Sequence, residues 1–301
     1  MSHFIATIIC NPNGAIKKPI YFIFAAGNTN HITYLISIGT GGLSTGTKAP
    51  QGEPAQNAVL WALKSGYRHI DTATLYGNEK DIGIGVIKSG IPRDQIFITT
   101  KIWDTDQGYE STLKAAETSL SKLQTYYIDL LLIHPPRPGP QKRIETYRAL
   151  QELVKRGIVR NIGVSNYNVK HLKELMDANP EIMPAINQIE AHPWNNRKEI
   201  ISYCTELKII VEAFTPLTRG KKFNDPVLVN ITKKYNKSPT HVLIRWALQN
   251  NFVVLPKSIK QTHIIDNTNV YDFVIDEEDM NILNNLNENF VAAGWDLSNV
   301  D

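Results

Sequence analysis

Four residues of different chemical types lie at or near the ends of three short apolar runs. Asp71 ends YRHID, Lys101 ends IFITTK and His134 ends IDLLLIH, and Tyr76 follows Asp71 by five residues. A tyrosine phenol has an ordinary pKa of about 10, so it donates a proton poorly at neutral pH unless a nearby cation lowers that pKa. A lysine held by an aspartate would supply the cation, and a neutral histidine could orient the substrate oxygen. The set therefore predicts proton donation to a carbonyl oxygen as hydride reaches its carbon.

Eight apolar runs of this kind alternate with segments of helical periodicity, and alternation predicts a parallel sheet. The runs span residues 35–39, 67–71, 96–101, 128–134, 159–166, 185–190, 209–214 and 252–257. Helix candidates span residues 54–65, 109–123, 142–156, 169–177, 198–207 and 239–250. Eight units without an interrupting linker predict a single α/β domain, a (β/α)8 or TIM barrel. Polar residues end nearly every run, and barrel enzymes carry their chemistry at strand C-termini, so the pattern favours an enzyme.

The composition is that of an ordinary globular protein. The 301 residues carry 32 basic and 29 acidic side chains, a net charge of +3, which argues against a nucleic-acid or membrane-surface partner. The two cysteines, Cys10 and Cys204, exclude a disulfide scaffold. The N-terminus lacks the Lys/Arg-rich start of a secretory signal and the apolar stretch 20–26 is too short to span a membrane, so a cytoplasmic location is predicted.

The common nucleotide and metal motifs are missing. The glycine-rich segment 39–46 has Ser44 where a dinucleotide fingerprint needs its third glycine, and Thr47 where a P-loop needs lysine. The sequence holds no HExxH zinc helix and no GxSxG elbow, and its eight histidines are scattered, so no metal site is predicted.

The segments GYRHIDTATLYGNE, ITTKIW, IDLLLIH, GVSNY and NQIE resemble the aldo-keto reductase family, over about residues 35 to 290. LYGNEKDIG, IRW and VEAFTPL resemble more narrowly the fungal reductases near the xylose reductase and 2,5-diketo-gluconate reductase groups. The resemblance implies a catalytic tetrad of Asp71, Tyr76, Lys101 and His134. It also implies NADPH as the cofactor, with NADH as a weaker alternative, and a small-molecule carbonyl compound as the substrate.

The resemblance also assigns cofactor contacts. Those near the nicotinamide are Thr40, Ser165, Asn166, Gln188 and Phe214, where Phe214 replaces the tyrosine that usually stacks on the ring. Those at the pyrophosphate lie in the loop 215–220 and include Thr215, Leu217 and Arg219. Those at the adenosine end are Lys257, Ser258, His263, Asp266 and Asn267. Because His263 replaces the usual arginine, the resemblance implies weaker discrimination for the 2′-phosphate, with an affinity that rises as the imidazole becomes protonated.

Two parts of the chain depart from the family pattern. Residues 1–34 fit an N-terminal hairpin followed by an atypical segment, either a true insertion or an error of the gene model, ahead of the barrel at 35–290 and a tail at 291–301. The substrate pocket lacks the family's aromatic residue after Thr40, which leaves Trp103 and the tail residue Trp295 as its candidate walls.

Three function classes remain to be compared. The first is a carbonyl reductase, and the second is a regulatory subunit that binds the cofactor on the same barrel with little turnover, like the β-subunits of potassium channels. The third is a barrel hydrolase or isomerase for phosphorylated substrates, which would need a glycine loop near the last strands, and the segment at Lys257 and Ser258 has none.

A barrel of this size can stand alone, so a monomer is predicted, with a homodimer as the alternative.

Overall fold

The computed structural model describes residues 21–24, 31–34, 36–39, 49–294, 296 and 300. Its strands are β1 Tyr21–Phe24, β2 His31–Tyr34, β3 Ile38–Gly39, β4 His69–Asp71, β5 Phe97–Ile102, β6 Ile128–Ile133, β7 Val159–Ser165, β8 Ile186–Glu190, β9 Ile210–Phe214 and β10 Val253–Leu255. Its α-helices are α1 Glu53–Lys64, α2 Glu79–Ser89, α3 Tyr109–Leu123, α4 Pro140–Lys155, α5 Val169–Asp177, α6 Lys198–Glu206, α7 Pro226–Tyr235, α8 Pro239–Gln249, α9 Gln261–Asp266 and α10 Glu277–Asn284.

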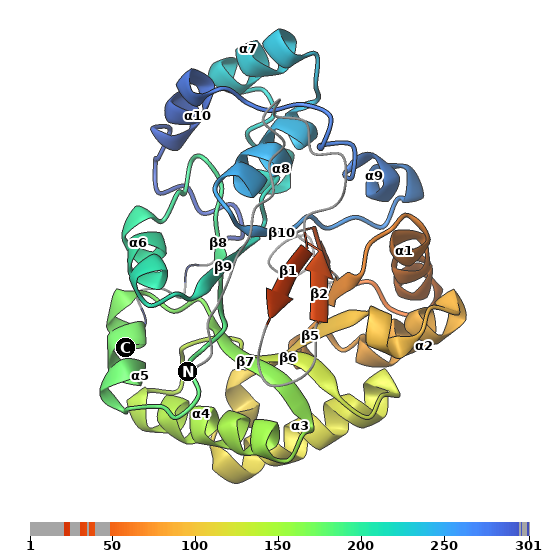
Figure 1. Ribbon diagram of the computed structural model, residues 1–301, viewed down its shortest axis with the longest axis vertical. Helices are drawn as coiled ribbons and strands as arrows, with labels where there is room; N and C mark the ends of the chain where they lie inside the picture. The colour runs from red at the N-terminus through yellow and green to blue at the C-terminus, as the bar shows by residue number, and fades with distance from the viewer. Residues whose placement is uncertain are drawn as a thin grey trace.

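Strands β3 to β10 form a parallel barrel. Each pairs with its sequence neighbour, in the order β10-β9-β8-β7-β6-β5-β4-β3. The segment that leads into β3 joins the far edge, because Ser37 N donates to Val254 O at 2.9 Å and Gly39 N donates to Pro256 O at 3.2 Å. The helices surround the ring of strands (Figure 1). The predicted (β/α)8 barrel is confirmed, and each of the eight predicted runs overlaps one of its strands.

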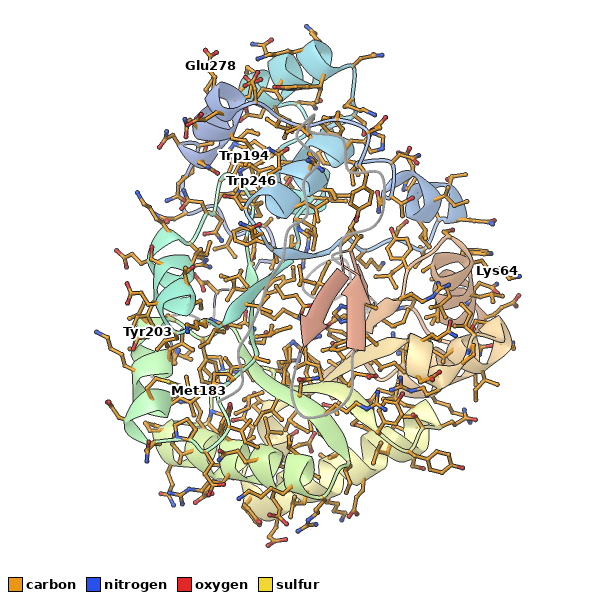
Figure 2. All side chains as sticks on the ribbon, in the orientation of Figure 1. Lys64, Met183, Trp194, Tyr203, Trp246 and Glu278 are labelled. Atoms are coloured by element: carbon orange, nitrogen blue, oxygen red, sulfur yellow. The ribbon has the colours of Figure 1, made fainter. Side chains whose placement is uncertain are left out.

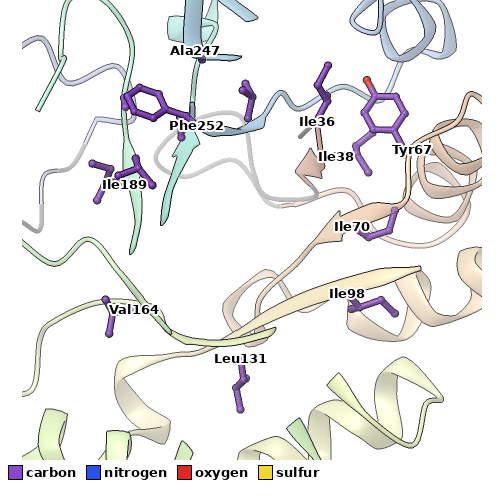
Figure 3. Packing of buried hydrophobic residues seen from close by; sticks show 14 of the residues in the cluster. Ile36, Ile38, Tyr67, Ile70, Ile98, Leu131, Val164, Ile189, Ala247 and Phe252 are labelled. Atoms are coloured by element: carbon purple, nitrogen blue, oxygen red, sulfur yellow. The ribbon is translucent and has the colours of Figure 1, made fainter. Parts of the chain in front are cut away.

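Alternate residues along the barrel strands pack into two hydrophobic layers, one between the strands and the helices and one inside the barrel. Ile70, Ile98, Leu131, Val164 and Ile189 belong to the large core cluster that joins the strands to the helices, as Figure 3 shows. Leu130 and Leu132 point the other way and join Phe97 and Ile186 in a small cluster inside the barrel. Side chains on a strand alternate between its two faces, so strands buried on both faces must be apolar nearly throughout. A charged residue in such a strand is therefore unusual, because its burial is costly unless the charge is paired or neutralised.

Two buried tryptophans tie the last helices to the barrel (Figure 2). Trp246 on α8 donates from Nε1 to Asn284 Oδ1 at the end of α10, at 2.7 Å. Trp194, after β8, donates to Asp225 Oδ2 at the start of α7, at 3.1 Å. Both rings are almost completely buried, so each N–H needs such a partner.

The N-terminal segment is described only in part. Strands β1 and β2 pair antiparallel, with Tyr21 opposite Tyr34 and Phe24 opposite His31. They fall within the predicted insertion, and their aromatic and β-branched residues favour strands. The predicted hairpin ahead of them lies outside the described residues. No helix in the described part of the chain is long and apolar enough to cross a membrane.

Gly163 in β7 provides a test of barrel packing. A Cβ at this position would lie 2.5 Å from the backbone oxygen of Ile186 on β8, so Gly163→Ala should push the two strands apart. We expect a loss of about 1–3 kcal/mol in the free energy of unfolding, measured by denaturant titration. Gly39→Ala is the matched control, because its Cβ would meet the nearest atom at an ordinary 3.6 Å. Equal stability of the two variants would contradict the packing argument.

Candidate active site

A buried ion pair lies at the C-terminal end of β4 and β5. Lys101 Nζ donates to Asp71 Oδ1 at 2.7 Å and to the backbone oxygen of Thr72 at 2.8 Å. Both side chains are almost completely buried, so each charge depends on the other. Burial lowers the pKa of the Lys101 ammonium, but Asp71, Tyr76 and Glu212 together outweigh it and raise that pKa above its ordinary value. Lys101 is therefore a permanent cation.

Tyr76 and His134 complete the predicted tetrad. Tyr76 ends the short 3₁₀ helix η1, Thr74–Tyr76, and its ring lies edge-on to His134, with 5.7 Å between centroids. The Lys101 ammonium lies 5.2 Å from the centroid of the Tyr76 ring. The structure thus brings together the four residues that the resemblance selected.

The protonation states follow from burial and from Lys101. Burial, assisted by Lys101 and Arg137, holds the pKa of His134 well below its ordinary value, so the imidazole is neutral, as expected. Burial, together with the charges of Asp71 and Glu212, raises the pKa of Tyr76 and outweighs the lowering by Lys101. The expected effect of Lys101 is therefore present, but the pKa of the phenol stays above its ordinary value because burial removes its hydration. Tyr76 is protonated at neutral pH.

Three predicted nicotinamide residues are joined to the tetrad. Asn166 Nδ2 donates to the backbone oxygen of His134 and to Ser165 Oγ, each at 3.0 Å. Ser165 Oγ in turn donates to the backbone oxygen of Gln188 at 2.9 Å. Gln188 Nε2 donates to Asp71 Oδ2 at 2.9 Å. A ligand carboxamide would therefore meet a prearranged set of polar groups on β7 and β8.

The loop after β9 holds the predicted pyrophosphate residues Thr215, Leu217 and Arg219, and it begins beside Phe214, the last residue of the strand. Thr215, Thr218 and Arg219 have positive φ angles of 54°, 49° and 54°. Non-glycine residues rarely adopt this left-handed conformation, which costs about 1–2 kcal/mol per residue. Leu217 (φ −90°, ψ 10°) followed by Thr218 is one right-handed residue before a left-handed one, the backbone combination that forms anion-binding concavities.

The predicted adenosine residues lie between β10 and the end of α9. Lys257 is half-buried, and no described residue pairs with its ammonium; burial lowers its pKa. Ser258 and Asn267 are buried, whereas His263 is exposed. Asp266 Oδ2 lies 3.1 Å from His241 Nε2, so that carboxylate already has a partner on α8.

Only one of the predicted pocket walls can be placed. Trp103 follows β5, lies edge-on to His134 with 5.1 Å between centroids, and carries the Arg137 guanidinium 5.2 Å from its ring centroid. Arg137 also pairs with Asp104 at 2.8 Å. Thr40 and Trp295 lie outside the described residues.

Comparisons with known proteins agree with this geometry. The Aldo/keto reductase family matches the chain over residues 35–288. The chain is 47% identical to the glyoxal reductase of Bacillus subtilis over 241 residues, covering 80% of this chain and 86% of that relative. The chain belongs to the aldo-keto reductase family. This makes it an oxidoreductase.

Solved structures of other reductases have the same fold. An aldo-keto reductase from a Medee basin deep-sea metagenome library superposes with a TM-score of 0.84 at 41% identity, covering 91% of this chain and 98% of that chain. An aldo-keto reductase of Bombyx mori, in complex with NADP, gives a TM-score of 0.80 at 32% identity, covering 88% of this chain and 92% of that chain. The narrower resemblance to the fungal groups stays a prediction.

The reductase site contains two glutamates that the sequence analysis did not select. Glu212 in β9 is fully buried, and its Oε2 accepts from Gln188 Nε2 at 2.7 Å. Glu190, at the end of β8, accepts from the backbone N–H groups of Ala292 and Ala293 and so holds these two residues against the strand. A charged residue within the otherwise apolar run IIVEAF was the available signal for Glu212.

Proposed function

We propose that the reductase converts a small aldehyde or ketone to an alcohol, with Tyr76 as the proton donor. The observation that carries the proposal is the cluster of a protonated tyrosine, a paired lysine cation and a neutral histidine at the strand C-termini. The matched glyoxal reductase acts, by its name, on a small dicarbonyl compound. Aldehydes and α-dicarbonyl compounds are therefore the first substrates to test.

The residues of this chain fit NADP(H), the cofactor that we assign to it. The half-buried Lys257 ammonium has no partner among the described residues, which suits a phosphate, and the left-handed loop after β9 suits the pyrophosphate. Ser165, Asn166 and Gln188 would hold the carboxamide of the nicotinamide. Phe214 would offer its ring for stacking. When bound, NADPH supplies the hydride.

In the proposed reaction, residues of this chain orient the carbonyl oxygen and protonate it. Tyr76 donates its phenolic proton to that oxygen, and Lys101 stabilises the resulting phenolate because its ammonium lies close to the ring. Asp71 keeps Lys101 charged and oriented. Neutral His134 orients the oxygen by a hydrogen bond, and Trp103 forms one wall beside it. Such general acid catalysis contributes roughly 10²- to 10⁴-fold in rate.

The experiment is a turnover assay of the purified protein that follows the loss of NADPH or NADH absorbance. The substrates are aldehydes, α-dicarbonyl compounds, α-keto esters and aldoses. Oxidation of NADPH that depends on one of these carbonyl compounds supports the proposal. Tight NADPH binding without turnover of any of them would overturn it and favour the regulatory-subunit function.

Lys257→Ala tests the assignment of the 2′-phosphate. Loss of a charge-assisted contact should weaken NADPH binding by about 10- to 100-fold, measured by fluorescence titration, and leave NADH binding nearly unchanged. Lys260→Ala removes an exposed lysine three residues away and serves as the control. Equal losses of affinity for the two cofactors in Lys257→Ala would contradict the assignment.

A further inference from the structure

The proposed mechanism leaves one buried acid of the site unused. Glu212 lies in β9, directly opposite Gln188 of β8 and Val253 of β10 in the strand register. Its side chain has no exposed surface. A carboxyl group in such a place either carries an uncompensated charge or stays protonated.

The contacts of Glu212 connect it to the tetrad. The Gln188 amide nitrogen donates to Glu212 Oε2 at 2.7 Å and to Asp71 Oδ2 at 2.9 Å, so one amide bridges the two carboxyl groups. The other oxygen, Glu212 Oε1, has no hydrogen-bond partner among the described residues. His69 Nε2 lies 3.8 Å from it, beyond hydrogen-bond distance.

A count of the charges decides which state Glu212 adopts. The titratable groups that face it are Asp71 and His69 on β4, Lys101 on β5 and Tyr76 in the loop after β4. Lys101 donates to Asp71 and not to Glu212. His69 cannot supply a second cation, because burial and then Lys101 lower its pKa to about 3.

Lys101 is therefore the one buried cation among these groups, and it faces two carboxyl groups, Asp71 and Glu212. Burial, followed by repulsion from Asp71, raises the pKa of Glu212 to about 8. An ionised Glu212 would in turn raise the pKa of Tyr76, in the same direction as Asp71 does.

We propose that Glu212 is a positioning residue: as a neutral acid it holds the Gln188 amide against Asp71, and its ionisation in alkaline solution makes Tyr76 retain its proton more strongly. This inference rests on the proposed role of Tyr76. Glu212 touches neither the substrate oxygen nor the reacting carbon in this scheme. Its effect passes through Gln188 and through the charge of the buried cluster.

The direction of the pH effect follows from the charges. Reduction needs protonated Tyr76, so its rate falls as the pH rises past the pKa of that phenol. In the wild type, Glu212 ionises first and shifts this fall to higher pH. Glu212→Gln has no such charge, so its alkaline fall in kcat should begin about one pH unit lower, a shift typical of one buried charge several ångströms away.

Two measurements test the proposal. The first compares pH profiles of kcat and KM for the wild type, Glu212→Gln and the control Glu79→Gln, which replaces a buried glutamate that bonds to Thr100. The second is the infrared difference spectrum of the cofactor-free protein between neutral and alkaline pH. Wild type and Glu79→Gln should lose the carbonyl stretch of a protonated carboxylic acid, and Glu212→Gln should lack this signal.

A third variant keeps the test decisive if Glu212→Gln does not fold. Gln188→Met removes the amide that stabilises the ionised form of Glu212, so the infrared signal should disappear at a higher pH than in the wild type. Absence of any titrating acid signal in the wild type overturns the proposal, as does a kcat profile in Glu212→Gln that coincides with the wild type. Lack of turnover in the wild type would count against the proposed function alone, because the infrared measurement needs no activity.

Discussion

Tyr76→Phe is expected to lower kcat for carbonyl reduction by about 10²- to 10⁴-fold while leaving NADPH affinity nearly unchanged. The ring remains, so its edge-on contact with His134 and its place near Lys101 are retained. Only the phenolic proton is lost. The loss should therefore fall on kcat rather than on cofactor binding, because the proton moves in the transition state.

Steady-state kinetics and a fluorescence titration with NADPH check this result. Tyr126→Phe is the matched control, because Tyr126 is 97% exposed and precedes the N-terminal end of β6, whereas the site lies at the C-terminal ends of the strands. Turnover of Tyr76→Phe close to that of Tyr126→Phe would refute the role of the phenol. A large loss of NADPH affinity would instead indicate that Tyr76 binds the cofactor.

Lys101→Met should impair both activity and stability. It leaves the buried Asp71 carboxylate without its ammonium, and breaking one side of a buried pair costs about 3–5 kcal/mol in the free energy of unfolding. It also removes the cation that stabilises phenolate at Tyr76, for which we expect a loss of about 10²- to 10³-fold in kcat.

Denaturant titration and kinetics of a second variant separate the two effects. The double variant Asp71→Asn/Lys101→Met removes both charges, so it should regain much of the lost stability and none of the activity. Lys155→Met is the control for the loss of a lysine charge, since Lys155 pairs with Glu181 at the surface, where ion pairs contribute little. An unfolding free energy of Lys101→Met equal to that of Lys155→Met would show that the buried pair does not stabilise the barrel.

The elements of this barrel were predictable because their signals are local. The periodicity of residues 109–123 and 169–177 gave the bounds of α3 and α5, since each helix shows one apolar face to the strands. Helices α2, α7, α9 and α10 were not among the helix candidates. The short helix α9 has six residues, too few for a periodic pattern to stand out.

The proximity of Asp71, Lys101 and His134 was also predictable, because they lie at the ends of successive strands and parallel strands bring these ends together. The pKa of Tyr76 could not be predicted from the sequence, because it depends on how completely the folded chain removes water from the phenol. Glu212 shows the same limit. The sequence gives a glutamate in an apolar run, but not which group it meets.

The sequence by itself determined the order of strands and helices, the family, and the residue types at the strand ends, because these depend on neighbours along the chain. Only the tertiary structure decided the closure of the barrel at Ser37 and Val254, the bridge from Asp71 through Gln188 to Glu212, and the anchoring of Ala292 on Glu190. Each of these joins residues far apart in sequence, within hydrogen-bond distances that no spacing along the chain encodes. Burial then sets the protonation states, and with them the chemistry that the site can perform.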